Sequence, residues 1–257
     1  MDPDTGFLDP ADENAAAAEE AARAALVGTG AYLLPPADVL ACLSADASSW
    51  AHFAAHWEDL TEDEYAARRG ARRLRRYGHF SLSPGTGELR LLPHTGFVQP
   101  GSTNPLYESV DRHFDPLTGN FVSDPTLRQI IGLLARVAAV LDVPEWWSVK
   151  VHPFRVVATA EGGGEPTPEG RHQDGVTLVS SLFIGRDNAT GGESTVYTPE
   201  GDEILSVTLC EPASLLVSDD RGLLHGVSPV RPVDATRTAH RDVLVTTLTP
   251  ADRADLS

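Results

Sequence analysis

The sequence predicts a mainly β fold with flanking helices (α+β). Residues 147–250 carry short apolar runs separated by turn residues, which is typical of a β-sandwich or β-barrel. The part before them carries apolar residues at helical spacing. At 257 residues the chain suits one domain with an extension. We expect residues 1–30 to form an acidic tail and an N-terminal helix, and residues 31–257 a single domain with its core at about 147–250.

Helices are expected through most of the N-terminal third. Residues 1–14 are acidic and predict a disordered or loosely docked tail, and the Ala-rich stretch 15–27 favours a helix. A short strand at 32–34 precedes a second helix that starts near residue 37. A further helix packed on the core is predicted by three aromatic residues at helical spacing, Trp50, Phe53 and Trp57.

Two groups of polar side chains in this region allow more than one interpretation. His52 and His56 are four positions apart, a spacing that can bind a metal on a helix. No third ligand follows nearby, so we interpret them as half-exposed imidazoles of an amphipathic helix. The arginines of residues 68–76 form a basic run without the supporting features of a nucleic-acid site, and a solvated helix face is its ordinary interpretation.

The middle of the chain predicts a hairpin and a helix. Residues 78–98 alternate in polarity around a turn signal at 83–87, which indicates the hairpin. Residues 97–114 are loop-like. Asp124 and Pro125 then suit the N-cap and first position of the clearest helix. Its apolar stripe should pack against the outside of a sheet and consists of Ile130, Leu133, Leu134, Val137 and Leu141.

The C-terminal part predicts strands joined by turns. The expected strands are residues 147–159, 176–184, 193–197, 206–209, 214–218 and 242–248. Gly191-Gly192 is expected to form a tight turn between strands, and a second turn at 219–222 precedes His225.

Composition excludes several classes of partner. The net charge of −17 would repel phosphates, so we expect neither nucleic acid nor an anionic membrane surface to bind. The sequence has no apolar run long enough for a membrane span and no signal-peptide core. Its two cysteines indicate no disulfide framework. A cytoplasmic protein is expected, and the sequence leaves its oligomeric state open.

The chemistry-bearing residues gather between positions 171 and 241. His172 and Asp174 are two positions apart, so on an extended strand both side chains point to the same face. With His225 they offer the two imidazoles and one carboxylate of the facial triad found in non-haem Fe(II) oxygenases. Arg241 follows His225 by about the length of a strand and a turn, and its guanidinium can hold a carboxylate by two hydrogen bonds.

At these residues the sequence resembles the bacterial Fe(II)/2-oxoglutarate dioxygenases that include L-isoleucine 4-hydroxylase and related hydroxylases of free amino acids. The resemblance extends from about residue 75 to residue 248. Its marks are the Pro168–Gly175 run and the Arg186-x-Asn188-x-x-Gly191-Gly192-Glu193 run, followed by a distal His and an Arg. The resemblance implies a double-stranded β-helix, or jelly-roll, core. It also implies Fe(II), 2-oxoglutarate and O2 as cofactor and co-substrates.

The resemblance further implies roles for individual residues. His172, Asp174 and His225 are the metal ligands and catalytic residues, and Arg241 binds the distal carboxylate of 2-oxoglutarate. Val243 stands where the family pattern has Ser, so the hydroxyl partner must come from elsewhere, with Thr246 and Ser228 as candidates. The candidate substrate-binding residues are Arg186, Asn188, Gln99, Asn104, Arg112 and Arg155.

Several alternatives remain open for these candidates. Arg186 and Asn188 either reach the substrate or only shape a turn, and Gln99, Asn104 and Arg112 either recognise an amino acid or belong to an ordinary loop. His152 is either a neighbour of the site or a core strand residue. The resemblance also suggests that a strand beginning near Arg75 faces an anionic group of the substrate.

The predicted function is hydroxylation of an unactivated C–H bond in a free L-amino acid, aliphatic or cyclic, with release of succinate and CO2. The carboxylate at Asp174 favours hydroxylation over halogenation, because related halogenases have a small residue there. The expected partner is the small-molecule amino acid substrate. A dioxygenase that acts on a protein- or carrier-bound residue, and a non-catalytic jelly-roll binding module, are the alternatives.

Overall fold

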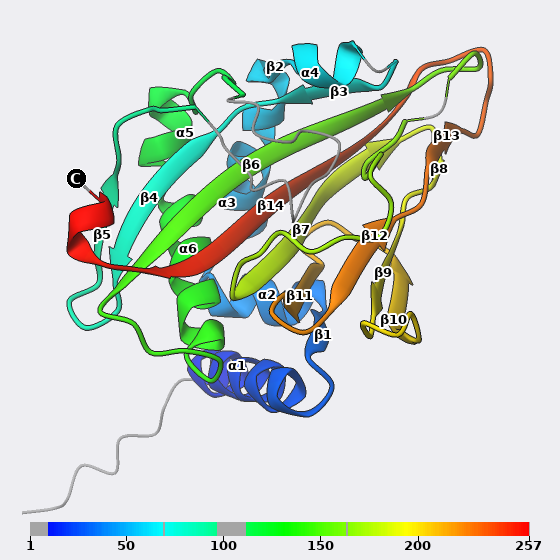
Figure 1. The fold of residues 1–257 in the computed structure, drawn as a ribbon. Coiled ribbons are helices and arrows are strands. Elements are labelled where there is room, and N and C mark those ends of the chain that lie inside the picture. The colour runs from blue at the N-terminus through cyan, green and yellow to red at the C-terminus, as the bar shows by residue number, and fades with distance from the viewer. Residues whose placement is uncertain (1–9, 69, 97–111, 163, 257) are drawn as a thin grey trace, which may run out of the picture.

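The computed structural model describes residues 10–68, 70–96, 112–162 and 164–256. A large and a small antiparallel sheet face each other, and helices cover the outer face of the large sheet (Figure 1). This arrangement is a jelly-roll core, so the expected mainly β fold with flanking helices is confirmed.

The large sheet is built around two long strands. Within the described residues it has nine strands. Seven follow in the order β1 (Ala31–Leu34), β11 (Leu215–Asp219), β7 (Leu178–Asp187), β14 (Ala239–Ala251), β6 (Trp146–Ala158), β3 (Arg72–Arg75) and β2 (Thr61–Glu62). β4 (Gly78–Ser83) pairs with both β6 and β5 (Glu88–Leu91). β6 and β14 pair along their whole length, from Ala239 opposite Ala158 to Ala251 opposite Trp146.

Shorter strands form the facing wall. β10 (Glu203–Thr208), β9 (Glu193–Tyr197) and β12 (Leu224–Val227) make a three-stranded sheet, and β13 (Val230–Pro232) pairs with β8 (Ala189–Gly191). β12 carries one of the predicted histidines, so it brings that side chain to the face opposite β14.

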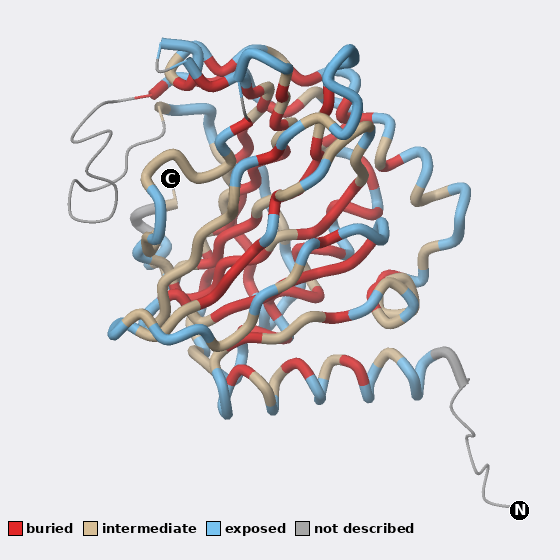
Figure 2. The backbone as a smooth tube through the Cα atoms, turned by 90° about the vertical axis from the view of Figure 1, so that its right-hand side faces the viewer, coloured by how far each residue is buried: buried red, intermediate tan, exposed pale blue. Residues whose placement is uncertain are grey.

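The helices pack on the large sheet through one apolar core. They are α1 (Pro10–Gly28), α2 (Pro36–Cys42), α3 (Ala47–Ala54), η1 (Ala55–Asp59), α4 (Glu64–Ala67), α5 (Gly119–Ser123), α6 (Pro125–Ala138) and η3 (Arg253–Leu256). The α6 N-cap is Asp124, whose side chain accepts the Thr126 backbone N–H at 2.8 Å. α6 presents Ile130, Leu133, Leu134 and Val137 to the core, as its sequence pattern predicts. Figure 2 shows the buried strands as a continuous red centre behind the exposed loops.

The pleat gives β6 and β14 two different faces. On β6, Trp147 and Val149 belong to the helix-covered core, whereas Ser148 and Lys150 line a cavity between the sheets. Because successive side chains of a strand alternate, one strand pair can form both the core and the wall of the cavity.

Some expectations differ from the structure. α1 begins at Pro10, so the helix takes in part of the acidic segment that was expected to be a tail. The arginine run does not form a helix face; it includes strand β3, whose Arg73 and Arg75 line the cavity. The division at residue 30 stays a prediction. No helix in the described part of the chain combines the length and the apolar character needed to cross a membrane.

Candidate metal and co-substrate site

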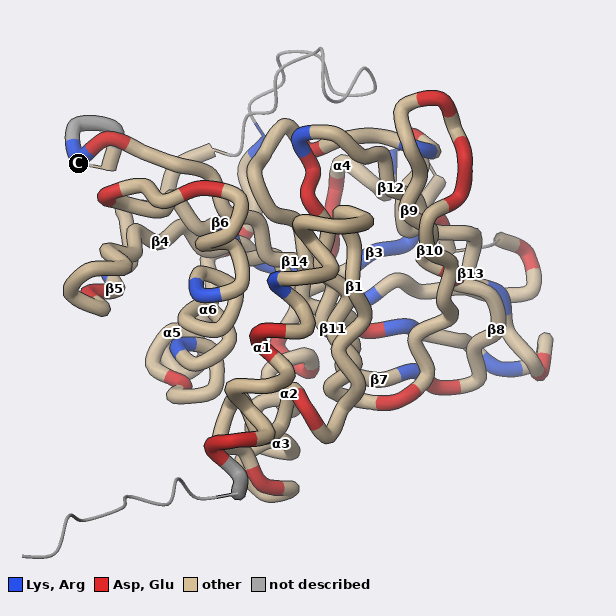
Figure 3. Tube along the Cα trace, turned by 90° about the horizontal axis from the view of Figure 1, so that it is seen from below, with Lys and Arg blue, Asp and Glu red and all other residues tan. Residues whose placement is uncertain are grey.

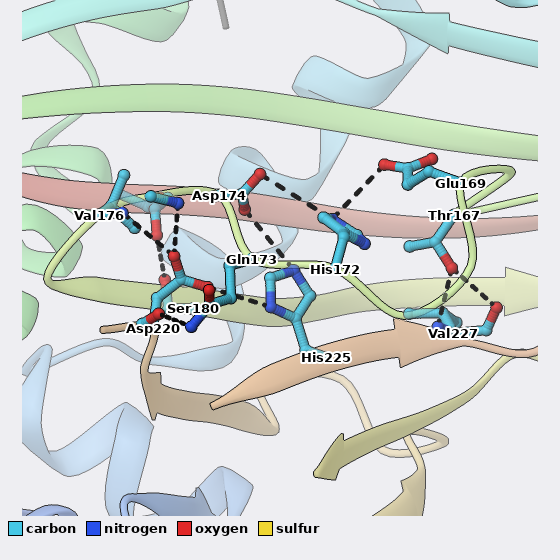
Figure 4. A network of polar contacts seen from close by, with 12 residues as sticks. Thr167, Glu169, His172, Gln173, Asp174, Val176, Ser180, Asp220, His225 and Val227 are labelled. Atoms are coloured by element: carbon cyan, nitrogen blue, oxygen red, sulfur yellow. Dashed lines mark hydrogen bonds and ion pairs between the residues drawn. The ribbon is translucent and has the colours of Figure 1, made fainter. Parts of the chain in front are cut away.

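His172 and His225 are held together by their own backbones. His172 lies in the extended segment before β7, and His225 lies on β12. Each donates its N–H to the carbonyl of the other, at 3.0 and 2.9 Å. The two ring centroids are 4.3 Å apart (Figure 4). The sequence predicted an extended conformation for His172 and Asp174, but the pairing is an isolated bridge and not part of a longer strand.

Asp174 completes a three-residue cluster. Its Oδ2 is 3.6 Å from His225 Nε2, and its Oδ1 is 3.9 Å from His172 Nε2. One ligand atom from each residue lies within 4.8 Å of the others. Two imidazole nitrogens and one carboxylate at this separation suit a divalent transition metal and leave further coordination positions open.

Other groups orient the two imidazoles. The Nδ1 of His172 is 3.0 Å from the Gly170 carbonyl oxygen, and the Nδ1 of His225 is 3.3 Å from Asp220 Oδ1. These contacts leave each Nε2 facing Asp174. Burial disfavours the imidazolium of His225, but the neighbouring carboxylates of Asp220 and Asp174 outweigh it and raise its pKa. Such outer groups fix the ring orientation of metal-binding histidines.

Asp220 is itself held rigidly. It is buried, and its Oδ2 accepts the backbone N–H groups of Gly175 and Val176 at 2.7 and 3.1 Å. Gln173 donates its side-chain amide to the Asp220 carbonyl at 2.9 Å. Asp220 therefore ties the segment around Asp174 to the turn that leads into β12 (Figure 4).

The cluster opens into a cavity of about 460 Å³ between the sheets. Basic residues from several elements line this cavity: Arg73, Arg75, Arg112, Lys150 and Arg241. Figure 3 marks the basic residues of β3 in blue among the acidic segments of the surface. A protein with a net charge of −17 therefore concentrates positive charge in its interior, which favours an anionic ligand there.

Arg241 is the most deeply placed of these cations. Only 2% of it is exposed, and its Nη2 donates to the Ser194 hydroxyl at 3.4 Å. Within the described residues, its buried Nε has no hydrogen-bond acceptor. Burial and the charge of nearby Arg186 lower the pKa of Arg241 to about 10, so the guanidinium stays charged at neutral pH. A buried cation with an unused donor suits a carboxylate ligand.

Gly192 makes room for this arginine. Its φ is +71°, in the left-handed region, and a Cβ built there would lie 2.8 Å from Arg241 Cδ. Gly191 has the same φ and packs against the Pro229 carbonyl. The predicted Gly-Gly turn therefore also leaves the space that the Arg241 side chain occupies.

A second basic group lies on β3 and β6. The Arg73 guanidinium donates to Asp63 Oδ2 at 2.9 and 2.7 Å, and Arg75 lies 3.8 Å from the same carboxylate. Burial opposes ionisation of Asp63, but the charges of the two arginines outweigh it and lower its pKa. Arg75 also reaches His152 Nδ1 at 2.6 Å and lies over the ring of Phe114 at 3.6 Å. His152 is thus a buried neighbour of the site.

The predicted substrate residues have different positions relative to the cavity. Gln99 and Asn104 fall outside the described residues, whereas Arg112 lines the cavity. Arg155 does not line it: the guanidinium pairs with Asp242 at 2.9 and 2.8 Å and with Glu58 at 2.8 Å. Both carboxylates satisfy Arg155 on the opposite side of its strand, so the prediction of substrate binding is corrected.

Arg186 and Asn188 shape a turn, which was the alternative interpretation. Arg186 donates to the carbonyls of Ala189 and Gly191 at 2.5 and 3.1 Å. Asn188 has φ +51°, and its side chain donates to the Asp234 carbonyl and accepts the Asp234 N–H. Neither residue is among those that line the cavity.

The two predicted hydroxyl partners also lie elsewhere. Ser228 accepts the Glu193 backbone N–H at 3.0 Å, which joins β9 to the end of β12. Thr246 is buried on the core face of β14, while its neighbours Val245 and Thr247 line the cavity. Ser194 instead supplies the hydroxyl that contacts Arg241. Strand alternation could have excluded Thr246, because it is an odd number of positions from Arg241.

Sequence reasoning also missed Glu169 and Asp220. Glu169 Oε1 is 3.4 Å from His172 Nε2, and its side chain is 12% exposed on the cavity wall. The sequence signal for Glu169 was its position three residues before His172. Asp220 gave no local signal, because its contact with the His172 segment is made only in the folded chain.

A jelly roll that places two histidines, an aspartate and a buried arginine around one interior cavity defines the class of mononuclear iron oxygenases. The family model described as 2OG-Fe dioxygenase matches residues 54–247. The chain therefore belongs to the 2OG-Fe dioxygenase family and is a dioxygenase enzyme. Members of this family use Fe(II), 2-oxoglutarate and O2, and the His-Asp-His cluster and Arg241 suit these groups.

Solved structures agree with this assignment. A BsmA homologue from Methylobium petroleophilum PM1 is 32% identical, with 91% of this chain and 93% of that chain covered and a TM-score of 0.84. IDO from Bacillus thuringiensis is 18% identical, with 98% and 100% covered and a TM-score of 0.74. The Fe(II)/α-ketoglutarate-dependent dioxygenase TqaL is 18% identical, with 97% and 93% covered and a TM-score of 0.74.

The latter two similarities show the fold alone. A comparison with curated proteins gives no significant match.

Proposed function

We propose that this dioxygenase hydroxylates an unactivated C–H bond of a free aliphatic or cyclic L-amino acid, with release of succinate and CO2. Within the family, we propose that this chain belongs with the hydroxylases of free amino acids that include L-isoleucine 4-hydroxylase. The observation that carries the proposal is the cavity, which combines the His-Asp-His cluster, the buried Arg241 and a second set of guanidiniums.

We assign the metal to His172, Asp174 and His225, and the distal carboxylate of 2-oxoglutarate to Arg241. The unused Nε of Arg241 and its Nη2 beside Ser194 support the second assignment. Bound iron(II) and 2-oxoglutarate supply the O2-dependent oxidation. The protein's own contribution is to position the C–H bond and to exclude water.

The amino acid's charged ends have complementary partners in the cavity. Arg75 and Arg112 are buried cations of the wall, and their positive charge is complementary to a carboxylate. Glu169 is a carboxylate of the wall next to His172 and can accept the substrate's ammonium group. Arg112 stays a candidate for substrate recognition, and Arg75 and Glu169 take the place of Arg155, Arg186 and Asn188.

The size of the site supports a small substrate. A volume of about 460 Å³ lies within the usual range of roughly 300–1,000 Å³ for small-ligand pockets. Action on a protein- or carrier-bound residue would require the cavity to admit a macromolecular chain.

The test is product analysis with matched blocked substrates. Purified protein with Fe(II) and 2-oxoglutarate is incubated with free L-amino acids, and mass spectrometry follows a gain of one oxygen together with succinate. Each reactive amino acid is then supplied as its N-acetyl and C-amide derivative. We expect hydroxylation of the free form and strong loss with either derivative. Efficient hydroxylation of carrier-linked or peptide forms, with none of the free amino acids, would refute the proposed substrate class.

A further inference from the structure

A second possible metal site lies behind the large sheet, among the helices. His52 is on α3, His56 is in η1, and Asp124 is the N-cap of α6. One ligand atom from each of the three residues lies within 4.8 Å of the others. Figure 1 shows α3 and α6 on the side of the sheet away from β9 and β12, so this cluster is separate from the cavity.

The fold supplies the third ligand that the local sequence lacks. His56 Nε2 is 2.9 Å from Asp124 Oδ2, although the two residues are 68 positions apart. His52 Nε2 is 4.0 Å from the same oxygen. The His52 and His56 ring centroids are 5.6 Å apart, because residues four positions apart share one side of a helix.

The cluster has a rigid part and an accessible part. The side chains of His56 and Asp124 are 7% and 2% exposed, and the His56 ring stacks on Phe121 at 4.5 Å. The His52 side chain is 75% exposed. Packing therefore fixes the side chains of His56 and Asp124. The exposed His52 side chain can move to coordinate an ion that enters from the solvent.

The charge on Asp124 also favours a cation. Its Oδ1 caps α6 through the Thr126 N–H, and its Oδ2 faces His56. Within the described residues, the ion-pairing partners of Asp124 are His52 and His56, and no Arg or Lys lies within 4.0 Å of its carboxylate. A buried carboxylate without a permanent cation is costly, and a divalent ion bound here would offset that cost.

We propose that His52, His56 and Asp124 form a second, three-ligand site for a divalent transition metal of the zinc type. Two imidazole nitrogens and one carboxylate oxygen suit Zn²⁺, with a water in the fourth position. Ni²⁺ and Cu²⁺ accept the same donors, whereas Fe²⁺ binds such ligands more weakly than Zn²⁺. The bound ion would join α3 to the N-terminus of α6.

The experiment measures Zn²⁺ binding by isothermal titration calorimetry in the full-length chain. The Asp174→Ala/His225→Ala variant removes the cavity cluster and serves as the background. We expect this background to retain one equivalent of Zn²⁺. Adding His52→Ala should weaken that binding at least tenfold. Asp124→Asn keeps an N-cap oxygen but removes the charge, and it should weaken binding as well.

His240→Ala in the same background is the matched control. His240 is also partly exposed and lies 3.7 Å from the carboxylate of Asp242, but within the described residues it belongs to no group of three possible metal ligands. We expect the control to bind Zn²⁺ as the background does. The proposal is overturned if the background binds no Zn²⁺, or if its binding is unchanged by both His52→Ala and Asp124→Asn.

Discussion

Arg241→Lys tests the co-substrate site most directly. The guanidinium is 2% exposed and faces the cavity from β14. Lys keeps the charge but has no planar fork. If Arg241 binds the distal carboxylate as proposed, the variant would lose one of two parallel hydrogen bonds to it. A hydrogen bond to a charged group contributes about 1.5–3 kcal/mol, which corresponds to a roughly 10- to 150-fold higher KM for 2-oxoglutarate.

The same variant should also become sensitive to pH. Burial already lowers the pKa of Arg241 to about 10, which still leaves it charged at neutral pH. A lysine starts from a lower pKa, so the same burial brings its titration toward the assay range. We therefore expect the KM for 2-oxoglutarate to rise further at alkaline pH in the variant and not in the wild type.

The assay is a pair of steady-state titrations, one of 2-oxoglutarate and one of the amino acid, with succinate as the readout. Val243→Ala is a control that changes the same cavity wall without touching charge. If Arg241→Lys raises only the KM for the amino acid, Arg241 binds the substrate, and the assignment of the co-substrate pocket is wrong.

Three further changes have expected outcomes. His225→Ala should abolish succinate formation and leave the far-UV circular dichroism unchanged, because the backbone pairing of residue 225 does not need the ring; wild-type turnover would remove His225 from the metal site. Gly192→Ala places a Cβ 2.8 Å from Arg241 Cδ and should raise the KM for 2-oxoglutarate, whereas Gly87→Ala, with a φ of +69° and open space, should not. Burial lowers the pKa of His79 from 6.5 to about 4, so its contribution to stability is complete above pH 6.5 and is lost as the pH falls toward 4. His79→Gln should therefore flatten the dependence of Tm on pH in that range, and an unchanged slope would contradict this assignment.

Local patterns in the sequence were sufficient for much of the fold. The alternation of residues 147–159 predicts β6, and Asp124 with Pro125 predicts the start of α6, because both signals depend on neighbouring residues. The three short strands β8, β12 and β13 had no such signal. Each has only three or four residues, and its conformation depends on pairing with a distant partner.

The site shows the same division between local and long-range information. The order of His172, Asp174 and His225 indicated a shared cluster, and the structure brings them together. The hydroxyl beside Arg241 could not be found from the sequence alone, because Ser194 reaches it across the cavity from the other sheet. The residue type of Arg155 suited substrate binding. Its pairing with Asp242 depends on the register between β6 and β14, which the sequence alone does not show.

The two faces of β6 and β14 also bear on which substitutions this enzyme can accept. Alternate positions line the cavity, among them Ser148, Lys150, Val245 and Thr247, while their neighbours pack against the helices. Substitutions at the cavity positions can alter which molecule is accepted without removing a side chain from the helix-covered core. A library confined to these four sites should therefore shift substrate choice while most members remain folded, so the protein is a tractable starting point for directing a dioxygenase to new substrates.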